Sequence, residues 1–237
     1  LVELRNRLLK AILLVLAIFL GLFYFANDLY LILVKPLSVL LPNTGNMIAT
    51  GVASPFLVPF KMTLVMAVLL AVPFILHQIW GFISPGLYQH EKKFGIPLLV
   101  SSVILFYSGI AFAYFVVLPL AFGFFSMAGP EGISFMPDIS NILDFILKIF
   151  FAFGIAFEIP VATFLMVLSG ITTVEALSSK RPYIFVGCFV VGMLVTPPDV
   201  ISQTILAVPM YMLFELGVIA SRLIKKEKDD TEETAED

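Results

Sequence analysis

Residues 94–118, FGIPLLVSSVILFYSGIAFAYFVVL, carry no charged side chain and decide the fold class. A helix needs about 20 consecutive apolar residues to cross the ~30 Å hydrocarbon core of a bilayer. Three further apolar runs of comparable length occupy residues 8–26, 58–82 and 145–168. The sequence therefore predicts an all-α protein that crosses a membrane several times.

The composition indicates that lipid is the main solvent of the chain. Hydrophobic residues make up 60% of the 237 residues and charged residues only 13%, whereas soluble domains carry about 25% charged residues. No linker separates the apolar runs, so we expect one transmembrane domain over residues 1–222. Residues 223–237 are rich in charge, and we expect them to form a disordered cytoplasmic tail.

The first run, residues 8–26, is too long for the core of a signal peptide and is followed by further runs, so we expect a retained helix. The chain does not begin with Met, and we expect residues before Leu1. Cys188 is the only cysteine, which excludes an intrachain disulfide.

The last two apolar segments are shorter and lie close together. Residues 183–195 would span only about 20 Å as a helix, and the TPPD sequence at 196–199 leaves no room for a soluble loop before residues 201–219. A helical hairpin in a locally thinned bilayer and a re-entrant element both fit this pattern. We expect two short spans, and six spans in all, because an even number agrees with the distribution of charge.

Lys and Arg residues predict the orientation, since loops rich in them stay in the cytoplasm. Most of the 14 basic residues fall on one side of a six-span arrangement. That side holds Arg5, Arg7, Lys10, Lys92, Lys93, Lys180, Arg181, Arg222, Lys225, Lys226 and Lys228. We therefore expect a multi-pass membrane protein with both termini in the cytoplasm. The long loops 27–57, with Pro36, and 119–144 then face outward as structured caps, and so does the turn that holds Asp199.

Glu158 is the strongest single indication of a functional site, because it lies near the middle of the fourth predicted span. A carboxylate at that depth is costly and has to face protein or a water-filled cavity. Pro160 removes a backbone donor and favours a bend in the same helix. The alternative is a neutral Glu158 in a purely structural interhelical hydrogen bond. Gln203 adds a polar side chain to the last span, whereas Lys61 and Lys148 are expected to snorkel to the outer interface.

The sequence does not indicate an enzyme. His77 and His90 are the only histidines, and neither belongs to an HExxH or comparable metal-binding spacing. No GxSxG motif and no glycine-rich phosphate loop occurs. We therefore expect no metal, no cofactor and no catalytic residue, and we also expect no nucleic-acid partner.

Several segments, in order along nearly the whole chain, resemble the TatC family. These are ELR at 3–5, FAND at 25–28, MIAT at 47–50, ASPF at 53–56, FISPGLY at 82–88, HE at 90–91, AFAYF at 111–115, FGIAFEIP at 153–160, KRPY at 180–183 and LVTPPD at 194–199. The resemblance stops at the charged tail. The family often has His-Leu shortly before its first Glu, whereas this chain begins at Leu1, so we expect residues that shape the receptor site to precede it.

The resemblance implies a concave bundle of six helices, the last two short, with both termini inside. It implies a receptor that binds signal peptides with two consecutive arginines and passes folded proteins across the cytoplasmic membrane, using the protonmotive force. The implied partners are single-span TatA- and TatB-type proteins, twin-arginine signal peptides, the lipid bilayer and further copies of the chain. The alternative function is a multi-span secondary transporter of a small solute, although we find no internal repeat typical of that class.

On this basis, carboxylates of the cytoplasmic face are the expected signal-peptide site. Two arginines present planar charged forks, which carboxylates bind through two parallel hydrogen bonds. Few acids lie on this face, and Glu3 and Glu91 fall in family-like segments, so we expect them to bind the arginine pair. The full expected signal-peptide site is Glu3, Arg5, Phe82, Pro85, Leu87, Glu91 and Lys92. Glu158, Pro160 and Gln203 are expected to contact a TatA-type helix, and Pro36 and Asp199 to lie on the outer face.

Overall fold

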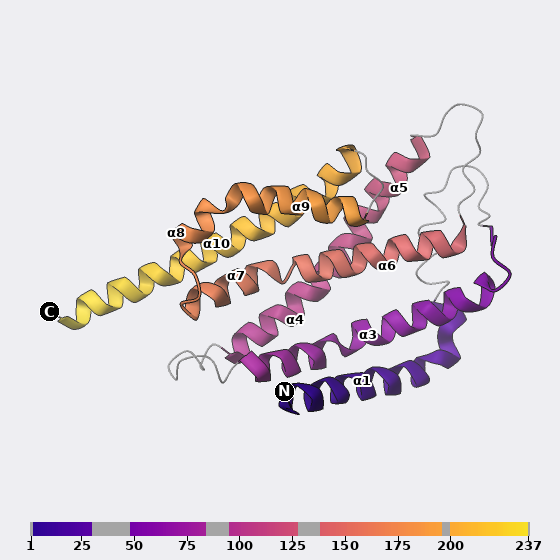
Figure 1. The fold of residues 1–237 in the computed structure, drawn as a ribbon, viewed down its shortest axis with the longest axis horizontal. Coiled ribbons are helices and arrows are strands. Elements are labelled where there is room, and N and C mark those ends of the chain that lie inside the picture. Colours follow the sequence, from indigo (N-terminus) through magenta and orange to yellow (C-terminus); the bar gives the residue numbers. More distant parts are fainter. Residues whose placement is uncertain (1, 30–47, 84–94, 128–137, 196–199, 237) are drawn as a thin grey trace. The chain divides into compact units, whose positions relative to one another are not determined.

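The computed structural model describes residues 2–29, 48–83, 95–127, 138–195 and 200–236. These residues are helical apart from short turns and an isolated bridge between Ile48 and Asp138. The chain forms two compact units, one of Leu1–Pro85 with Ala113–Phe150 and one of Gly86–Phe112 with Phe151–Asp237. The elements in chain order are α1 (Val2–Leu22), η1 (Phe23–Phe25), α3 (Ser54–Ile83), α4 (Gly95–Phe112), η4 (Ala113–Val117), α5 (Leu118–Met127), α6 (Ile139–Ala156), α7 (Ile159–Leu168), α8 (Val174–Ser179), α9 (Arg181–Val195) and α10 (Val200–Glu236) (Figure 1).

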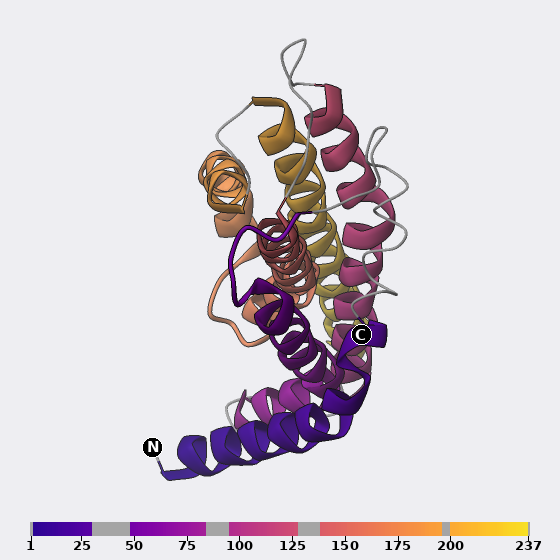
Figure 2. The ribbon, with the colours of Figure 1, turned by 90° about the vertical axis from the view of Figure 1, so that its right-hand side faces the viewer.

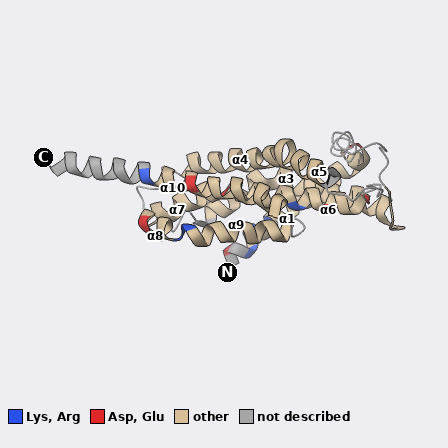
Figure 3. Cartoon of the chain, turned by 90° about the horizontal axis from the view of Figure 1, so that it is seen from above, with Lys and Arg blue, Asp and Glu red and all other residues tan. Residues whose placement is uncertain are grey.

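The apolar helices confirm the predicted fold class, an all-α polytopic membrane protein. Among the described residues, five helical stretches are long and apolar enough to cross a membrane, and Arg181–Val195 is a shorter apolar helix. Figure 3 shows the same feature as long tan stretches of helix with few blue or red positions. The five long stretches are Arg5–Leu29, Ser54–Gly81, Gly95–Phe124, Ile139–Leu168 and Val200–Arg222. Each of them, and the short helix, contains or overlaps one of the six predicted spans.

The predicted end of the third span before Pro119 is wrong. The helix continues from α4 through the π-helix η4 into α5, and α5 ends at Met127 (Figure 2). Proline is tolerated in the first turn of a helix, where its missing N–H is not needed. Pro119 occupies the second position of α5, directly after the π-helical turn, and so does not end the helical path.

The bounds predicted for the second outer loop, residues 119–144, are wrong for the same reason and for one more. Helix α6 begins at Ile139, because Asp138 caps it: its Oδ1 accepts the backbone N–H of Ser140 at 2.8 Å and of Asn141 at 3.3 Å. A carboxylate in this position satisfies donors that a helix start leaves free. The sequence gives Asp138 no special prominence, so hydropathy alone placed the start too late.

The end of the chain is helical, since α10 continues as one element from Val200 to Glu236. The sequence predicts a disordered tail from residue 223 instead. The division into a transmembrane domain and a tail at residue 222 stays a prediction.

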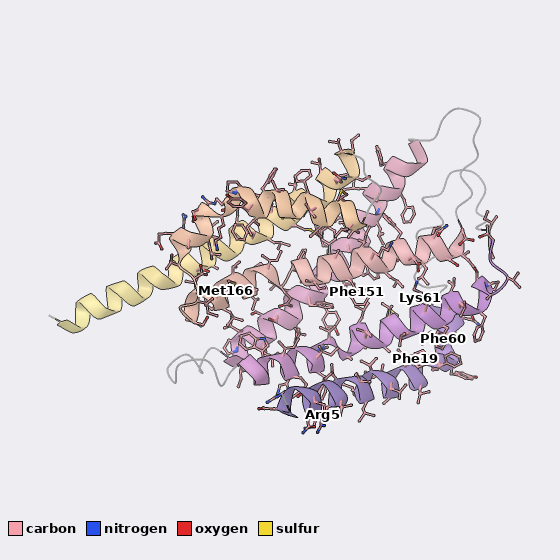
Figure 4. The ribbon with its side chains drawn as sticks, viewed as in Figure 1. Arg5, Phe19, Phe60, Lys61, Phe151 and Met166 are labelled. Carbon is pink, nitrogen blue, oxygen red and sulfur yellow. The ribbon has the colours of Figure 1, made fainter. Side chains whose placement is uncertain are left out.

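In the first unit, α1 packs along α3, and side chains of α3 meet side chains of α6 in one apolar cluster. The rings of Phe19 on α1 and Phe60 on α3 meet edge to face, with centroids 5.2 Å apart. Both side chains are labelled in Figure 4. The contact between α3 and α6 is an apolar cluster of buried side chains. Its members are Val58, Met62, Leu143 and Leu147.

Asp138 also joins the described ends of the two long segments that are predicted to face outward. Its Oδ2 accepts the backbone N–H of Thr50 at 2.8 Å and the Thr50 hydroxyl at 2.6 Å, and Ile139 N donates to Ile48 O at 3.0 Å. The hydrogen bonds that the Asp138 carboxylate accepts favour its ionised form, and they lower the pKa of Asp138 from 3.8 to about 2. Pro36 and Asp199, predicted on the same outer face, lie outside the described residues.

In the second unit, α10 packs against α7, α8 and α9. The buried side chains Val174, Leu177, Phe214 and Val218 form its core. An ion pair joins the start of α9 to α10. Arg181 Nε and Nη2 each lie 2.7 Å from a different carboxylate oxygen of Glu215. Tyr211 donates to the same carboxylate at 2.8 Å. The ion pair therefore holds the first residue of α9 against α10.

Candidate functional site

The first candidate site is the exposed carboxylate of Glu3 in the first turn of α1. Its side chain is 65% exposed, and Arg7, one turn further along, donates to it twice. Both hydrogen bonds end on Oε1: Arg7 Nη2 donates at 2.8 Å and Nε at 3.2 Å. Glu three or four residues before Arg is the favourable order for such a pair on a helix. The structure therefore presents a carboxylate that already holds one guanidinium at one of its two oxygens.

Helix α3 holds Arg7 from the other side. Arg7 Nη1 lies 3.4 Å from the Gln78 carbonyl oxygen and 3.5 Å from the Gln78 side-chain oxygen, which makes both contacts long. The guanidinium also lies against Gly81: a Cβ atom at that position would be 3.2 Å from Arg7 Cζ and closer still to Nη1. An alanine at this position would therefore require the Arg7 guanidinium to shift. Arg7 is accordingly only 24% exposed.

The other residues predicted around Glu3 are only partly described. Arg5 is exposed on α1 (Figure 4). The backbone of Phe82 belongs to α3, and nothing beyond its backbone is described. Pro85, Leu87, Glu91 and Lys92 lie outside the described residues, so whether they accompany Glu3 stays a prediction.

The prediction included Arg7 only as one of the cytoplasmic basic residues. The four-residue spacing of Glu3 and Arg7 is a sequence signal that indicates their pairing. The contact of Arg7 with Gln78 and Gly81 has no such signal, because those residues lie on another helix.

The second candidate site is Glu158, which lies where the fourth long stretch bends. Helix α6 ends at Ala156 and α7 begins at Ile159, so Phe157 and Glu158 form a turn between them. Pro160 stands in the first turn of α7, which confirms the predicted interruption of this helix. The Ser102 hydroxyl on α4 is hydrogen-bonded to the Glu158 carboxyl.

One oxygen of Glu158 lacks a partner. Oε1 is buried, and no donor among the described residues reaches it. A buried polar atom without a hydrogen bond costs about 1–3 kcal/mol. A hydrogen bond from a donor outside the chain would remove this cost. The backbone at Pro160 is itself crowded, because Gly217 of α10 packs against Pro160 and Thr163 at a separation that only glycine permits.

Gln203, the third residue predicted to contact a partner, lies in α10 opposite Gly192 of α9. A Cβ atom on Gly192 would be 3.5 Å from the Gln203 carbonyl oxygen and 3.9 Å from its Cβ. Helices α9 and α10 therefore approach closely at this point, and the Gln203 side chain is partly exposed beside the contact.

Lys61 was predicted to snorkel, and the structure adds a partner that the sequence did not indicate. Its Nζ donates to Asp144 Oδ1, which joins α3 to α6. The two side chains are 53% and 43% exposed, so the pair faces the surroundings of the helices. In a membrane, an ion pair lowers the cost of placing either charge near the hydrocarbon.

Comparison with known proteins decides the family. The family described as Sec-independent protein translocase protein (TatC) matches residues 1–209. The chain belongs to the TatC family. Among curated TatC proteins, that of Azotobacter chroococcum mcd 1 is 59% identical over 97% of this chain and 90% of its own length. That of Escherichia coli strain K12 is 56% identical over 94% of this chain and 86% of its own length.

The solved TatC structures agree with this assignment. A crystal structure of the twin-arginine translocase receptor TatC superposes with a TM-score of 0.83 at 37% identity, and covers 93% of this chain and 97% of the crystallised one. A second crystal structure, of TatC in DDM, gives a TM-score of 0.82 at the same identity. This TatC chain is thus a multi-pass membrane component of a Sec-independent protein translocase, and a transport protein rather than an enzyme. The family favours protein translocation over the alternative of a small-solute transporter.

Proposed function

We propose that this chain is the receptor subunit of a twin-arginine translocation system. It binds signal peptides with two consecutive arginines at its cytoplasmic face, assembles with TatA- and TatB-type single-span proteins, and exports folded proteins at the expense of the protonmotive force. Both termini lie in the cytoplasm, and the membrane is the cytoplasmic (inner) one. The observation that carries the proposal is the Glu3 carboxylate, which is exposed and already accepts a guanidinium from within the chain.

The chemistry of Glu3 suits an arginine ligand. A guanidinium offers parallel N–H donors in a rigid fork, and a carboxylate accepts them with good geometry. In Glu3, both described hydrogen bonds use Oε1, and Oε2 remains for a donor of the peptide. Glu91 takes the second arginine in this proposal, with Arg5 and Lys92 beside the carboxylates. Phe82, Pro85 and Leu87 pack against the apolar residue that follows the arginine pair.

Partner binding uses the second unit in this proposal. The buried Oε1 of Glu158 lacks a donor within the described part of the chain, and a polar side chain in the span of a TatA-type helix would supply one. Gln203 offers both donors and acceptors to the same kind of partner. Copies of the chain also associate with one another in the receptor complex.

The test is peptide affinity measured on the full chain in lipid nanodiscs. Glu3→Ala and Glu91→Ala should each weaken binding of a twin-arginine peptide by about tenfold to a hundredfold, the low end of what truncating a paired charge costs, because the site borders water. A twin-lysine peptide serves as the control, since an ammonium cannot reproduce the fork. Unchanged affinity in both variants, while the parent still prefers the arginine peptide, would place the site elsewhere.

A crosslinking experiment separates the receptor from the small-solute transporter. A photoreactive twin-arginine peptide should attach near Lys10 and in the segment of Glu91 if the chain is a receptor. A solute transporter needs no peptide site on its cytoplasmic face, and absence of crosslinks there would favour it.

A further inference from the structure

The guanidinium of Arg7 is held on two sides at once. One side donates twice to Oε1 of Glu3, at 2.8 Å and 3.2 Å. The other side faces the Gln78 carbonyl oxygen and fills the space above Gly81. Gln78 belongs to α3, so its carbonyl oxygen has a position fixed by the helix backbone. A surface ion pair between residues four apart on a helix is otherwise weak, and its side chains change rotamer freely. The contacts of Arg7 with Gln78 and Gly81, called its seat on α3 below, therefore fix the geometry of the pair.

The fixed geometry has a consequence for the carboxylate. Two hydrogen bonds to one oxygen set the plane of the carboxyl group and occupy Oε1, so that Oε2 is the oxygen left for a second donor. With Oε1 occupied, an incoming fork can place its two donors on Oε2, as Arg7 places its own two on Oε1. This geometry requires a carboxylate held in a suitable plane, whereas an ammonium is a point charge with rotatable donors and tolerates any orientation. Orienting Glu3 therefore benefits an incoming arginine more than an incoming lysine.

We propose that Arg7 is the positioning residue that sets the preference for arginine over lysine in the signal peptide, by fixing the Glu3 carboxylate from its seat on Gln78 and Gly81. This inference rests on the proposed function, in which Glu3 receives a peptide arginine. Arg7 acts through Glu3 and does not contact the peptide in this proposal.

The positive charge of Arg7 alone has a different effect. Repulsion from a fixed charge weakens the binding of an arginine peptide and a lysine peptide by a similar factor, so it leaves their affinity ratio unchanged. The ratio is thus the quantity that separates orientation of Glu3 from simple electrostatics.

The experiment measures the affinity of a twin-arginine and a twin-lysine peptide for the full chain in nanodiscs. Arg7→Lys keeps the charge, but a lysine cannot reproduce the two hydrogen bonds that Arg7 Nε and Nη2 donate to Glu3 Oε1. Gly81→Ala keeps Arg7 and places a methyl group in its seat. In both variants the arginine-to-lysine affinity ratio should fall at least about threefold, mainly because arginine-peptide binding weakens.

A matched control accompanies these variants. Gly21→Ala adds a methyl group to α1 where nothing lies within 4 Å, and it should not change the ratio. Alanine favours a helix over glycine, so a lower ratio in Gly81→Ala would not come from a weaker α3.

The outcomes are distinct. If Glu3→Ala leaves arginine-peptide affinity unchanged, Glu3 is not the receptor carboxylate, and the proposed site and this inference fail together. If Glu3→Ala weakens binding but Arg7→Lys and Gly81→Ala both keep the parental ratio, the receptor site stands and the role of Arg7 is overturned.

Discussion

Gly217 on α10 permits a very close approach of two helices, and its replacement is a sharp test of the packing in the second unit. A Cβ atom at this position would lie 2.8 Å from Cα of Pro160 and even closer to the hydroxyl of Thr163. The threonine can rotate, but the Pro160 atom belongs to the backbone and cannot. Gly217→Ala therefore forces α10 away from α7 next to the bend that carries Glu158.

The expected loss of stability follows from three contributions. Overpacking of this kind costs about 1–3 kcal/mol. The Thr163 hydroxyl donates to Ile159 O at 2.9 Å and Pro160 O at 3.0 Å, and moving it away costs about 0.5–1.5 kcal/mol. The alanine regains about 0.5–1 kcal/mol through its helix propensity. The net destabilisation is about 2 kcal/mol, which corresponds to a melting temperature lower by about 4–8 °C for a chain of this size.

Thermal unfolding of the purified chain in detergent measures this effect. Gly187→Ala on α9 is the matched control, because nothing lies within 4 Å of the added methyl group, and it should melt at or slightly above the parental temperature. The double variant Gly217→Ala, Thr163→Ala should remain less stable than the parent, because removing the hydroxyl leaves the clash with the Pro160 backbone. A Gly217→Ala variant as stable as the parent would refute the close approach of α7 and α10.

Two further predictions concern carboxylates. Glu158→Ala should weaken crosslinking to a TatA-type helix and reduce transport, while the melting temperature stays near that of the parent; Glu158→Gln should be milder, because an amide retains hydrogen-bonding capacity. Normal crosslinking and transport by Glu158→Ala would remove it from the partner site. Asp138→Asn should lose a pH-dependent stabilisation: the lowered pKa of Asp138 means that its ionised form stabilises the fold above about pH 4, and that this contribution disappears as pH falls towards about 2. Thermal unfolding between pH 6 and pH 2 checks this, and parallel profiles of variant and parent would contradict it.

The membrane-spanning helices could be predicted from the sequence because lipid imposes a length. A span needs enough apolar residues to cross the hydrocarbon, and this requirement is local in the sequence. The ends of the helices were less predictable. Pro119 continues a helix because a π-helical turn precedes it, and α6 starts where Asp138 supplies a cap. Both depend on hydrogen bonds that hydropathy does not record.

The partners of the charged side chains could not be predicted. Lys61 and Asp144 are 83 residues apart, and Arg181 and Glu215 are 34 residues apart. No local pattern links such positions in a single sequence. The prediction that Lys61 snorkels follows from its depth alone, and its pairing depends on how α3 and α6 pack.

Each candidate carboxylate stands near a close contact at a glycine. Glu3 is held by Arg7 over Gly81, and Glu158 lies two residues from Pro160, which packs on Gly217. In lipid there is no hydrophobic force between helices, so association depends on close packing at small residues and on polar contacts. Close packing of this kind restrains the backbone next to the carboxylate. This arrangement lets a helix surface bathed in mobile lipid present a charged group in a defined geometry, which is what a receptor for a planar guanidinium requires.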